Sequence, residues 1–463
     1  MPRNAFTILP ALLAPLFAAA VSDVERVYRN HCMNCHGANM EGGSAPSMLD
    51  DEWRYGRDDA VLADVIREGR PEDGMPAYGE TLSGEEIRAL VILIQEKNAE
   101  ASPPPPPEPL GGEVYEAGGH RFRLETVAEG FDLPWSLAFL PGGDRLVSER
   151  GGTLWRIDPD RGRRLEIRGT PEVFARGQGG LLDVAVHPDY AENGWIYLSY
   201  SDPSRSGERG MTAIVRGRLR GDRWIDEETV FRAPGEFYEG TRLHFGTRLV
   251  FHGPYLFFTI GDRGRQRQAQ DLSRPNGKTH RIHHDGRIPE DNPFVDRDDA
   301  FPSIWTYGNR NAQGLALDPS TGNLWETEHG PRGGDELNLL RAGANYGWPV
   351  VTFGMNYNGT PITDRTSAPG MVDPVVQWTP SLAVCGLAFY GADRFPEWTG
   401  SLLSGGLASQ ELRLLVLDGE EVVDQPVLIE GKGRVRDVVV GPDGLPYVVF
   451  NRPGRIVRMV PVE

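Results

Sequence analysis

The run Leu181-Leu182-Asp183-Val184-Ala185-Val186-His187-Pro188 contains the repeat that decides the fold. Its centre, a short apolar triplet followed in several copies by a proline turn, recurs at intervals of about 50 to 70 residues. The six copies are Leu137–Phe139, Val184–Val186, Leu249–Phe251, Leu315–Leu317, Leu387–Phe389 and Val438–Val440. This repeat predicts a six-bladed β-propeller over residues 115–463. A pair of β-sandwiches is the alternative, but it does not require six similar units.

A proline run separates this region from a helical one. Pro103 to Pro107 are consecutive, which is typical of a stiff polyproline II spacer, so we expect a linker at residues 99–114. Residues 21–98 show helical periodicity, and Ser83-Gly84-Glu85-Glu86 is a capping box in front of an apolar stripe. The predicted fold is therefore multidomain, a small all-α domain followed by an all-β propeller.

The pentapeptide Cys32-Met33-Asn34-Cys35-His36 matches the attachment pattern of a c-type haem. Cys32 and Cys35 would bind the vinyl groups, and His36 would ligate the iron. A zinc site is the alternative, but no second cysteine pair or suitably spaced histidine lies nearby.

Met75, in the loop Gly74-Met75-Pro76, is the expected sixth ligand of the haem iron. Met33, Met40 and Met48 are the other candidates. A His/Met pair raises the reduction potential and suits an electron acceptor. Residues 21–98 resemble a small class I cytochrome c domain through the haem motif, this loop and the terminal helix.

Residues 1–20 are typical of a secretory signal peptide, with Arg3 at the start, an apolar stretch and Ala18-Ala19-Ala20 as a cleavage site. An uncleaved membrane anchor is the alternative, which Pro10, Pro15 and the short length disfavour. We therefore expect a periplasmic or secreted protein with no membrane span after cleavage.

Charge and motifs exclude several classes of partner. The formal net charge of −18 argues against binding to nucleic acid or an anionic membrane surface. Two of the three cysteines lie in the haem motif, so there is no disulfide framework. Gly277-Lys278-Thr279 is preceded by Leu272 where a phosphate-binding loop needs glycine, and no dinucleotide fingerprint occurs.

Polar clusters stand at the ends of the predicted strands. Arg310, Arg434 and Arg436 predict a basic funnel that suits an anionic ligand with several carboxylates. The segment Gly330-Pro331 and the acids near it offer the oxygen ligands that calcium prefers. For each arginine, a solvated strand end or an internal salt bridge is the alternative.

Residues 118–460 resemble the soluble pyrroloquinoline quinone-dependent glucose and aldose sugar dehydrogenases. The matching runs are Leu133-Pro134-Trp135, Gly177 to Leu182, His244-Phe245-Gly246, Gly261 to Gly264, Asp291 to Phe294, Glu328 to Asn338 and Asn345 to Pro349. They extend over nearly the whole predicted propeller.

The resemblance implies a role for several residues. His244 matches the general base that takes the proton of the anomeric hydroxyl, and Arg310 matches the residue that stabilises charge on the quinone. Cofactor-binding positions are matched by Gln178, Asn311, Arg434 and Arg436. Gly330 and Pro331 match the calcium site at the quinone, and Glu336 and Tyr346 match a second calcium site.

Other histidines and three departures from the family pattern complete the comparison. His280, His283 and His284 are rival bases but are better explained as packing or surface residues on a turn, and His187 and His252 as structural residues on blade turns. The departures are Ala408 where the family often has lysine, Asn309 where it usually has histidine, and Val384-Cys385-Gly386 where Pro-Ser-Gly is common. We expect Cys385 to be buried.

The resemblance implies a periplasmic dehydrogenase that uses a quinone acceptor. It would oxidise the C1 hydroxyl of an aldose to the lactone with pyrroloquinoline quinone and calcium, and pass electrons to its own haem and then to a downstream acceptor. The proline spacer would let the haem domain reach the mouth of the funnel. A sugar-binding propeller without catalysis is the alternative; a six-bladed lactone hydrolase would leave the haem unexplained.

Overall fold

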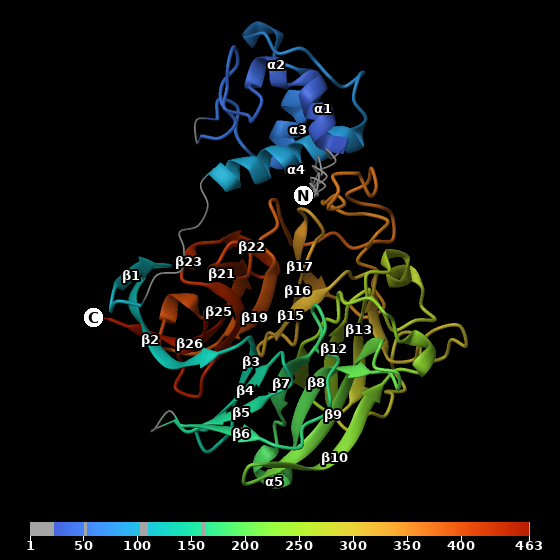
Figure 1. Cartoon of the computed structure of the whole chain (residues 1–463), viewed down its shortest axis with the longest axis vertical. Helices are drawn as coiled ribbons and strands as arrows, with labels where there is room; N and C mark the ends of the chain where they lie inside the picture. Colours follow the sequence, from blue (N-terminus) through green and yellow to red (C-terminus); the bar gives the residue numbers. More distant parts are fainter. Residues whose placement is uncertain (1–22, 51–52, 102–109, 160–162, 463) are drawn as a thin grey trace, which may run out of the picture.

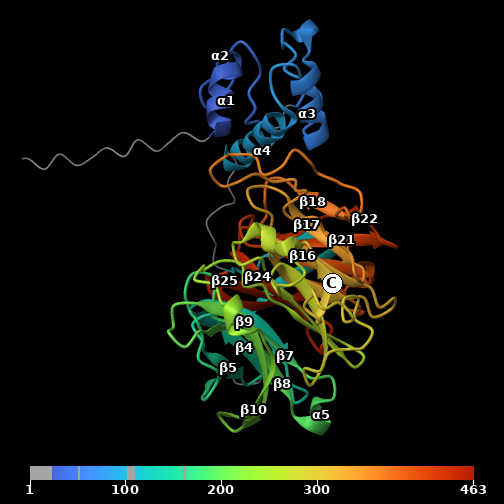
Figure 2. The same cartoon turned by 90° about the vertical axis from the view of Figure 1, so that its right-hand side faces the viewer.

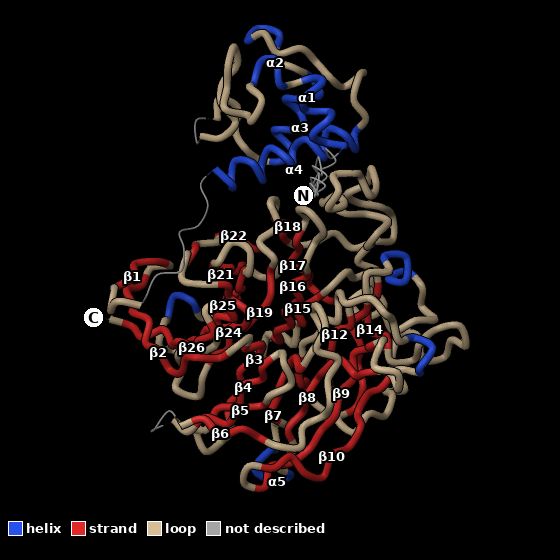
Figure 3. Tube along the Cα trace, in the orientation of Figure 1, coloured by secondary structure: helices blue, strands red, loops and turns tan. Residues whose placement is uncertain are grey.

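The computed structural model describes residues 23–50, 53–101, 110–159 and 163–462 of the 463-residue chain. The expected signal peptide at 1–20 and the proline run at 103–107 lie outside these residues. Within them, an N-terminal helical domain sits on a larger domain of β-strands (Figures 1 and 3). No helix in these ranges is long and apolar enough to cross a membrane.

The N-terminal domain consists of α1 (Asp23–His31), α2 (Met33–His36), α3 (Asp59–Glu68) and α4 (Gly84–Ala101), with a 3-10 turn at Pro71–Asp73. The capping box at the start of α4 is present: the Glu86 N–H donates to Ser83 Oγ (3.2 Å) and the Ser83 N–H donates to the Glu86 carboxylate (2.9 Å). α4 packs against α1 and α3. It continues past residue 98, into the range expected for the linker, because no helix breaker precedes the prolines.

Six antiparallel sheets form the propeller. The first three are β3 (Pro134–Phe139), β4 (Arg145–Glu149), β5 (Leu154–Ile157) and β6 (Arg164–Ile167); β7 (Leu181–Val186), β8 (Ile196–Pro203), β9 (Gly210–Arg220) and β10 (Arg223–Arg232), with the short helix α5 (Tyr190–Asn193) after β7; and β11 (Leu249–His252), β12 (Tyr255–Ile260), β13 (Lys278–His283) and β14 (Ile304–Tyr307).

The other three sheets follow in chain order. They are β15 (Ala312–Leu317), β16 (Leu324–Glu328), β17 (Asp335–Leu340) and β18 (Val376–Trp378); β19 (Val384–Tyr390), β20 (Ser401–Gly406), β21 (Glu411–Asp418) and β22 (Glu421–Asp424), with β23 (Val427–Glu430) also paired to β21; and β24 (Arg434–Val440), β25 (Pro446–Arg452) and β26 (Gly454–Pro461), joined by β2 (His120–Phe131) and β1 (Val114–Ala117).

The six-bladed prediction is confirmed strand by strand. Each apolar triplet of the sequence repeat lies on the first strand of one sheet: β3, β7, β11, β15, β19 and β24. These strands contact one another in a closed ring, in which β24 returns to β3. The repeat therefore marks the innermost strand of every blade.

The sixth blade closes the ring with strands from both ends of the domain. β2 pairs with β26 in antiparallel register, with Leu124 opposite Met459. Both side chains are buried in the apolar core shared with the first and fifth blades. Joining the two ends in one sheet removes the free edges that an open sheet would expose.

Candidate functional site

The residues expected to bind the cofactor or act in catalysis lie at one end of the central channel of the propeller, before or at the start of innermost strands. Gln178 precedes β7, His244 precedes β11, Arg310 and Asn311 precede β15, and Arg434 begins β24. The segment 329–334 follows β16, which is antiparallel to β15, and so returns to the same end. We call this end the rim site, comprising His244, Arg310, His329, Arg434 and Arg436.

His244 is held by a buried carboxylate. Its Nδ1 lies 2.6 Å from Asp262 Oδ1, and the Trp348 indole N–H donates to Asp262 Oδ2 at 2.9 Å. The Gly264 N–H also donates to Oδ1, at 2.7 Å. Asp262 is fully buried, so these donors hold the carboxylate, and through it the imidazole, in one orientation.

The charges around His244 favour a neutral ring. Burial lowers the pKa of His244, and the nearby Arg310 acts in the same direction against the opposing effect of Asp262. Burial alone would raise the pKa of Asp262, but the hydrogen bond and charge of His244 and the charge of Arg310 outweigh it and lower that pKa. Ionised Asp262 can only accept, so His244 Nδ1 carries the proton and Nε2 keeps a free lone pair. This is the form that a general base requires.

Gln178 and Asn311 hold the backbone around His244. The His244 N–H donates to Gln178 Oε1 (2.7 Å), and the Gly246 N–H donates to Asn311 Oδ1 (3.2 Å). His244 itself has a left-handed φ of 51°, a conformation that needs such support in a non-glycine residue. The backbone of Gly261 lies close to that of His244. Only glycine fits there, since a Cβ at residue 261 would lie 2.5 Å from the His244 carbonyl oxygen.

Arg310 connects the His244 region to the segment after β16. Its Nη1 donates to the carbonyls of His329 (2.8 Å) and Gly330 (2.6 Å). Its own carbonyl accepts from the Asp262 N–H at 2.7 Å, and its N–H donates to the Glu328 carboxylate at 2.6 Å. The guanidinium is therefore fixed on the same end of the channel as His244.

The four residues expected to bind calcium surround one small cavity. Its volume is about 10 Å³, and its lining includes Arg310, Glu328, Gly330, Pro331, Glu336 and Tyr346. Burial raises the pKa of Glu328 to about 7, and raises that of Glu336 as well. Two adjacent buried carboxyls supply oxygen atoms of the kind that calcium prefers as ligands.

Calcium at this cavity would depend on backbone oxygens. Within the described ranges, no three His, Cys, Asp or Glu side chains are grouped so that they could hold a metal ion. The Tyr346 hydroxyl donates to the Leu339 carbonyl (2.6 Å) and accepts from the Arg341 N–H (2.9 Å), which leaves its carbonyl as the available ligand. The Gly330 carbonyl already accepts from Arg310 but retains a second lone pair.

Arg436 adds positive charge to the rim site and has no carboxylate partner among the described residues. The Arg436 Nη1 donates to Gln313 Oε1 (2.6 Å), while its buried Nε has no partner among the described residues. Burial, together with the charges of Arg248, Arg434 and Arg150, lowers the pKa of Arg436 to about 10. Such uncompensated positive charge fits an anionic cofactor with several carboxylates, as pyrroloquinoline quinone is.

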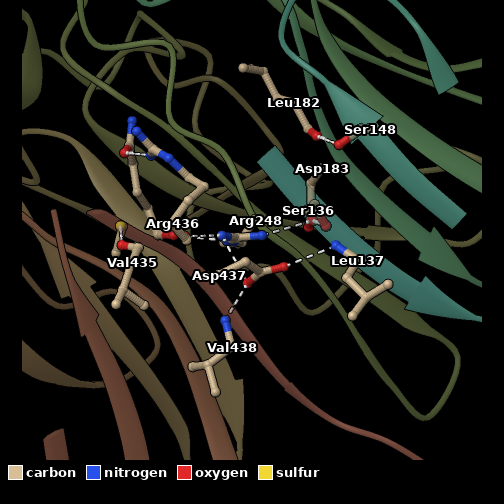
Figure 4. Close-up of polar contacts among 12 residues, drawn as sticks. Ser136, Leu137, Ser148, Leu182, Asp183, Arg248, Val435, Arg436, Asp437 and Val438 are labelled. Carbon is tan, nitrogen blue, oxygen red and sulfur yellow. Dashed lines mark hydrogen bonds and ion pairs between the residues drawn. The ribbon is translucent and has the colours of Figure 1, made fainter. Parts of the chain in front are cut away.

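Deeper in the channel, Arg248 forms a fully compensated centre. Its guanidinium pairs with Asp183 (3.1 Å) and Asp437 (3.0 Å) and donates to the carbonyls of Gln313 (2.9 Å) and Arg436 (3.0 Å). Figure 4 shows Arg248 with Asp183, Arg436 and Asp437, which come from two other blades, and Gln313 belongs to a fourth. We call Asp183, Arg248 and Asp437 the central ion-pair cluster.

The rival histidines are structural. His280 lies within β13, fully buried, with Nδ1 near Ser303 Oγ (2.9 Å) and Nε2 near the Pro275 carbonyl (2.9 Å). His283 ends the same strand, whereas His284, 2.8 Å from His187, lies on a turn as expected. Because His280 and His283 are three residues apart on a strand, their side chains lie on opposite faces of the sheet.

Lys278, Cys385 and Ala408 differ in their surroundings. Lys278 donates to three backbone carbonyls, those of Gln268, Ala269 and Asn276. Cys385 is buried as expected, and its Sγ lies 3.1 Å from the Val435 carbonyl. Ala408 is exposed.

Sequence reasoning assigned no role to Asp262, His329 or Arg248. Asp262 and His329 stand inside the runs quoted for the resemblance, directly after strands, which was the available signal. Arg248 follows Gly246-Thr247 at the entrance to β11, and nothing in its local pattern indicates that two carboxylates from distant blades meet it.

The haem motif of the N-terminal domain is arranged for covalent attachment. The Cys32 and Cys35 thiols are free, and His36 Nδ1 lies 3.1 Å from the Pro46 carbonyl, an arrangement that leaves Nε2 for iron. Met75 packs against the same apolar cluster as Cys32, as do Met33 and Met48, whereas Met40 is 3% exposed in the core. Trp53 Nε1 is buried without a partner in the described ranges and could donate to a haem carboxylate. These residues fit a c-type haem.

Comparisons with known proteins match both domains. The family model of glucose/sorbosone dehydrogenase matches residues 131–458, and that of subunit III of cbb3-type cytochrome c oxidase matches residues 19–94. The aldose sugar dehydrogenase YliI of Escherichia coli is 41% identical over 346 residues, which cover 73% of this chain and 92% of that protein.

Two solved structures extend the similarity to three dimensions. The soluble aldose sugar dehydrogenase of Escherichia coli in its apo-form has a TM-score of 0.70 and 39% identity, covering 74% of this chain and 100% of that one. The PQQ-bound aldose sugar dehydrogenase of Streptomyces coelicolor has a TM-score of 0.61 and 32% identity, covering 76% and 99%. The N-terminal domain is a cytochrome c domain, and the chain belongs to the glucose/sorbosone dehydrogenase family.

Proposed function

We propose that the protein oxidises the C1 hydroxyl of an aldose to the lactone, with pyrroloquinoline quinone and calcium in the propeller and electron transfer to its own c-type haem. The observation that carries this proposal is the neutral, oriented His244, whose free Nε2 lies at the same end of the channel as the uncompensated arginines. The printed names of the aligned relatives, aldose sugar dehydrogenases, supply the substrate class.

His244, Asp262 and Arg310 would have different roles in oxidation of the sugar. Pyrroloquinoline quinone, when bound, supplies an acceptor for the hydride of C1. His244 Nε2 takes the proton of the C1 hydroxyl, and ionised Asp262 stabilises the imidazolium that this creates. Arg310 supplies fixed positive charge in a site largely closed to water, where such charge stabilises negative charge most strongly.

The arginines of the rim site and the segment after β16 would bind the cofactor and calcium. Arg434 and Arg436 would neutralise its carboxylates, with Gln178 and Asn311 at the adjacent backbone. Calcium would be held by the carbonyls of Gly330 and Pro331, and a second calcium by Glu336 and the Tyr346 carbonyl.

The redox balance requires an external acceptor. Conversion of an aldose to its lactone releases two protons and two electrons. A haem attached to Cys32 and Cys35, with its iron held by His36 and Met75, would accept these electrons one at a time, so an external one-electron acceptor would be needed. We place this chemistry in the periplasm, with residues 1–20 as signal peptide, 21–98 as cytochrome domain, 99–114 as linker and 115–463 as the dehydrogenase domain.

Haem reduction tests the proposal directly. The haem-loaded protein is mixed with quinone and calcium, and then with a panel of aldoses, and the haem α band is followed. An aldose that sharpens the band only when the quinone is present supports the proposal. Sugar binding measured by calorimetry without haem reduction for any aldose would instead support a sugar-binding propeller without catalysis.

A further inference from the structure

Helix α4 faces the propeller (Figure 2), and Asp59 at the start of α3 also accepts a hydrogen bond from Gln377 of the propeller at 3.3 Å. Arg88 donates to three backbone carbonyls of the segment between β17 and β18: to Thr352 (3.3 Å), Thr363 (3.0 Å) and Asp364 (2.6 Å). Because the planar guanidinium of Arg88 donates hydrogen bonds to three carbonyls, it is fixed in one orientation.

Two further contacts continue along the same face of α4. Glu96 pairs with Arg332 at 2.6 Å, and both side chains are mostly buried, at 19% and 17% exposed. Ile92 lies against Gly333, where a Cβ would be 3.4 Å from the Ile92 side chain. Because Arg88, Ile92 and Glu96 are spaced by four residues, they form a single stripe, which we call the α4 stripe.

The α4 stripe contacts the same segment that contacts Arg310. Arg332 and Gly333 follow Gly330, whose carbonyl accepts from the Arg310 guanidinium at 2.6 Å. The Arg332 backbone also exchanges two hydrogen bonds with Met355 (3.0 and 2.9 Å), and Met355 is buried in the apolar core of the cytochrome domain. Residues 330–334 thus join the rim site directly to the cytochrome domain.

Beside the α4 stripe the interface is hollow. A cavity of about 810 Å³ lies there, lined by polar residues of both domains such as Arg57, Asp59 and Arg413 and by apolar residues such as Val91 and Phe353. Because the two domains do not fill this space, the specific contacts of the α4 stripe contribute strongly to how the domains are oriented.

We propose that the α4 stripe is the electron-transfer docking surface of this protein, holding the cytochrome domain against the segment that contacts Arg310. A fixed contact then replaces the free movement expected from the proline spacer. The inference rests on the proposed function for the source of the electrons. Each transfer reduces one ferric haem to ferrous haem, which an external one-electron acceptor reoxidises before the second electron follows.

Two substitutions on the cytochrome side test the proposal without touching the rim site. Arg88→Ala removes three hydrogen bonds from a charged group, and Glu96→Gln removes one charge. In the holoenzyme, rapid mixing with aldose should give haem reduction slower by about tenfold in Arg88→Ala and less in Glu96→Gln. Sugar oxidation with a soluble dye that takes electrons from the propeller should stay unchanged.

Matched controls and a charge swap sharpen the result. Arg26→Ala on α1, whose side chain is 66% exposed and pairs with Asp23 of the same helix, should leave haem reduction unchanged. Glu96→Arg should slow haem reduction more than Glu96→Gln, and the double variant Glu96→Arg with Arg332→Glu should recover most of the rate. Normal haem reduction in both Arg88→Ala and Glu96→Arg would overturn the proposal.

A second readout is independent of turnover. If the unaltered protein oxidises no sugar with either acceptor, the proposed function fails, and hydrogen exchange of the haem-loaded, quinone-free protein still tests the docking. Amides of residues 88–96 and 352–364 should exchange faster in Arg88→Ala than in Arg26→Ala. Equal exchange in the two variants would overturn the docking surface.

Discussion

Two layers of arginine lie in the central channel of the propeller, and they are compensated in opposite ways. In the central ion-pair cluster, Arg248 pairs with Asp183 and Asp437 and also reaches two carbonyls. At the rim site, Arg436 contacts one amide oxygen, and its Nε has no partner in the described ranges. A protein keeps an uncompensated buried charge only where something else supplies the counter-charge. The difference therefore separates residues that hold blades together from residues that hold a ligand.

The largest expected effect comes from removing the base at the rim site. His244→Ala should lower kcat by about 10²- to 10⁴-fold, because no other group takes the hydroxyl proton. Quinone binding, followed by absorbance, should persist. His252→Ala, at an exposed position at the end of β11, is the control and should keep full activity. Activity retained in His244→Ala would break the assignment of the chemistry to the rim site.

Loss of the compensated arginine should act on stability instead. Arg248→Met leaves two buried carboxylates without their cation and should reduce the stability of the propeller by about 3 to 5 kcal/mol. The denaturant midpoint of the propeller transition measures this, with Arg287→Met as an exposed control. An unchanged midpoint would show that the central ion-pair cluster does not stabilise the ring.

Loss of Arg436, the uncompensated arginine, should weaken cofactor binding and leave stability intact. Arg436→Met removes a charge that burial and neighbouring arginines disfavour, so the denaturant midpoint should stay the same or rise. The Kd for pyrroloquinoline quinone should increase by about 10- to 100-fold, because charged hydrogen bonds to the ligand are lost. If Arg436→Met destabilises the fold as much as Arg248→Met does, the two layers are not distinct.

The smallest effect concerns pH. Burial lowers the pKa of His244 from its ordinary 6.5, and protonation removes the lone pair that the reaction needs. The activity of the neutral form therefore persists to lower pH, and the acid limb of kcat/KM should lie below pH 6.5. An acid limb at or above pH 6.5 would mean that Asp262 raises the pKa of His244 by more than burial and Arg310 lower it.

The haem motif, the capping box at Ser83 and the six apolar triplets could all be predicted because each is a local pattern. The triplets identify innermost strands because they are short apolar runs that recur once in every blade. The closure of the ring by β2 and β26 could not be predicted this way, because pairing between chain ends leaves no local pattern.

The amino-acid sequence by itself determined the haem-attachment pentapeptide, the six blades and the position of His244 before an innermost strand. Only the tertiary structure decided which charges meet: Asp262 with His244, two carboxylates with Arg248, and Glu96 of α4 with Arg332 of the propeller. The reason is physical. A backbone pattern depends on neighbours in the chain, whereas the energy of a buried charge depends on partners that only folding brings within reach.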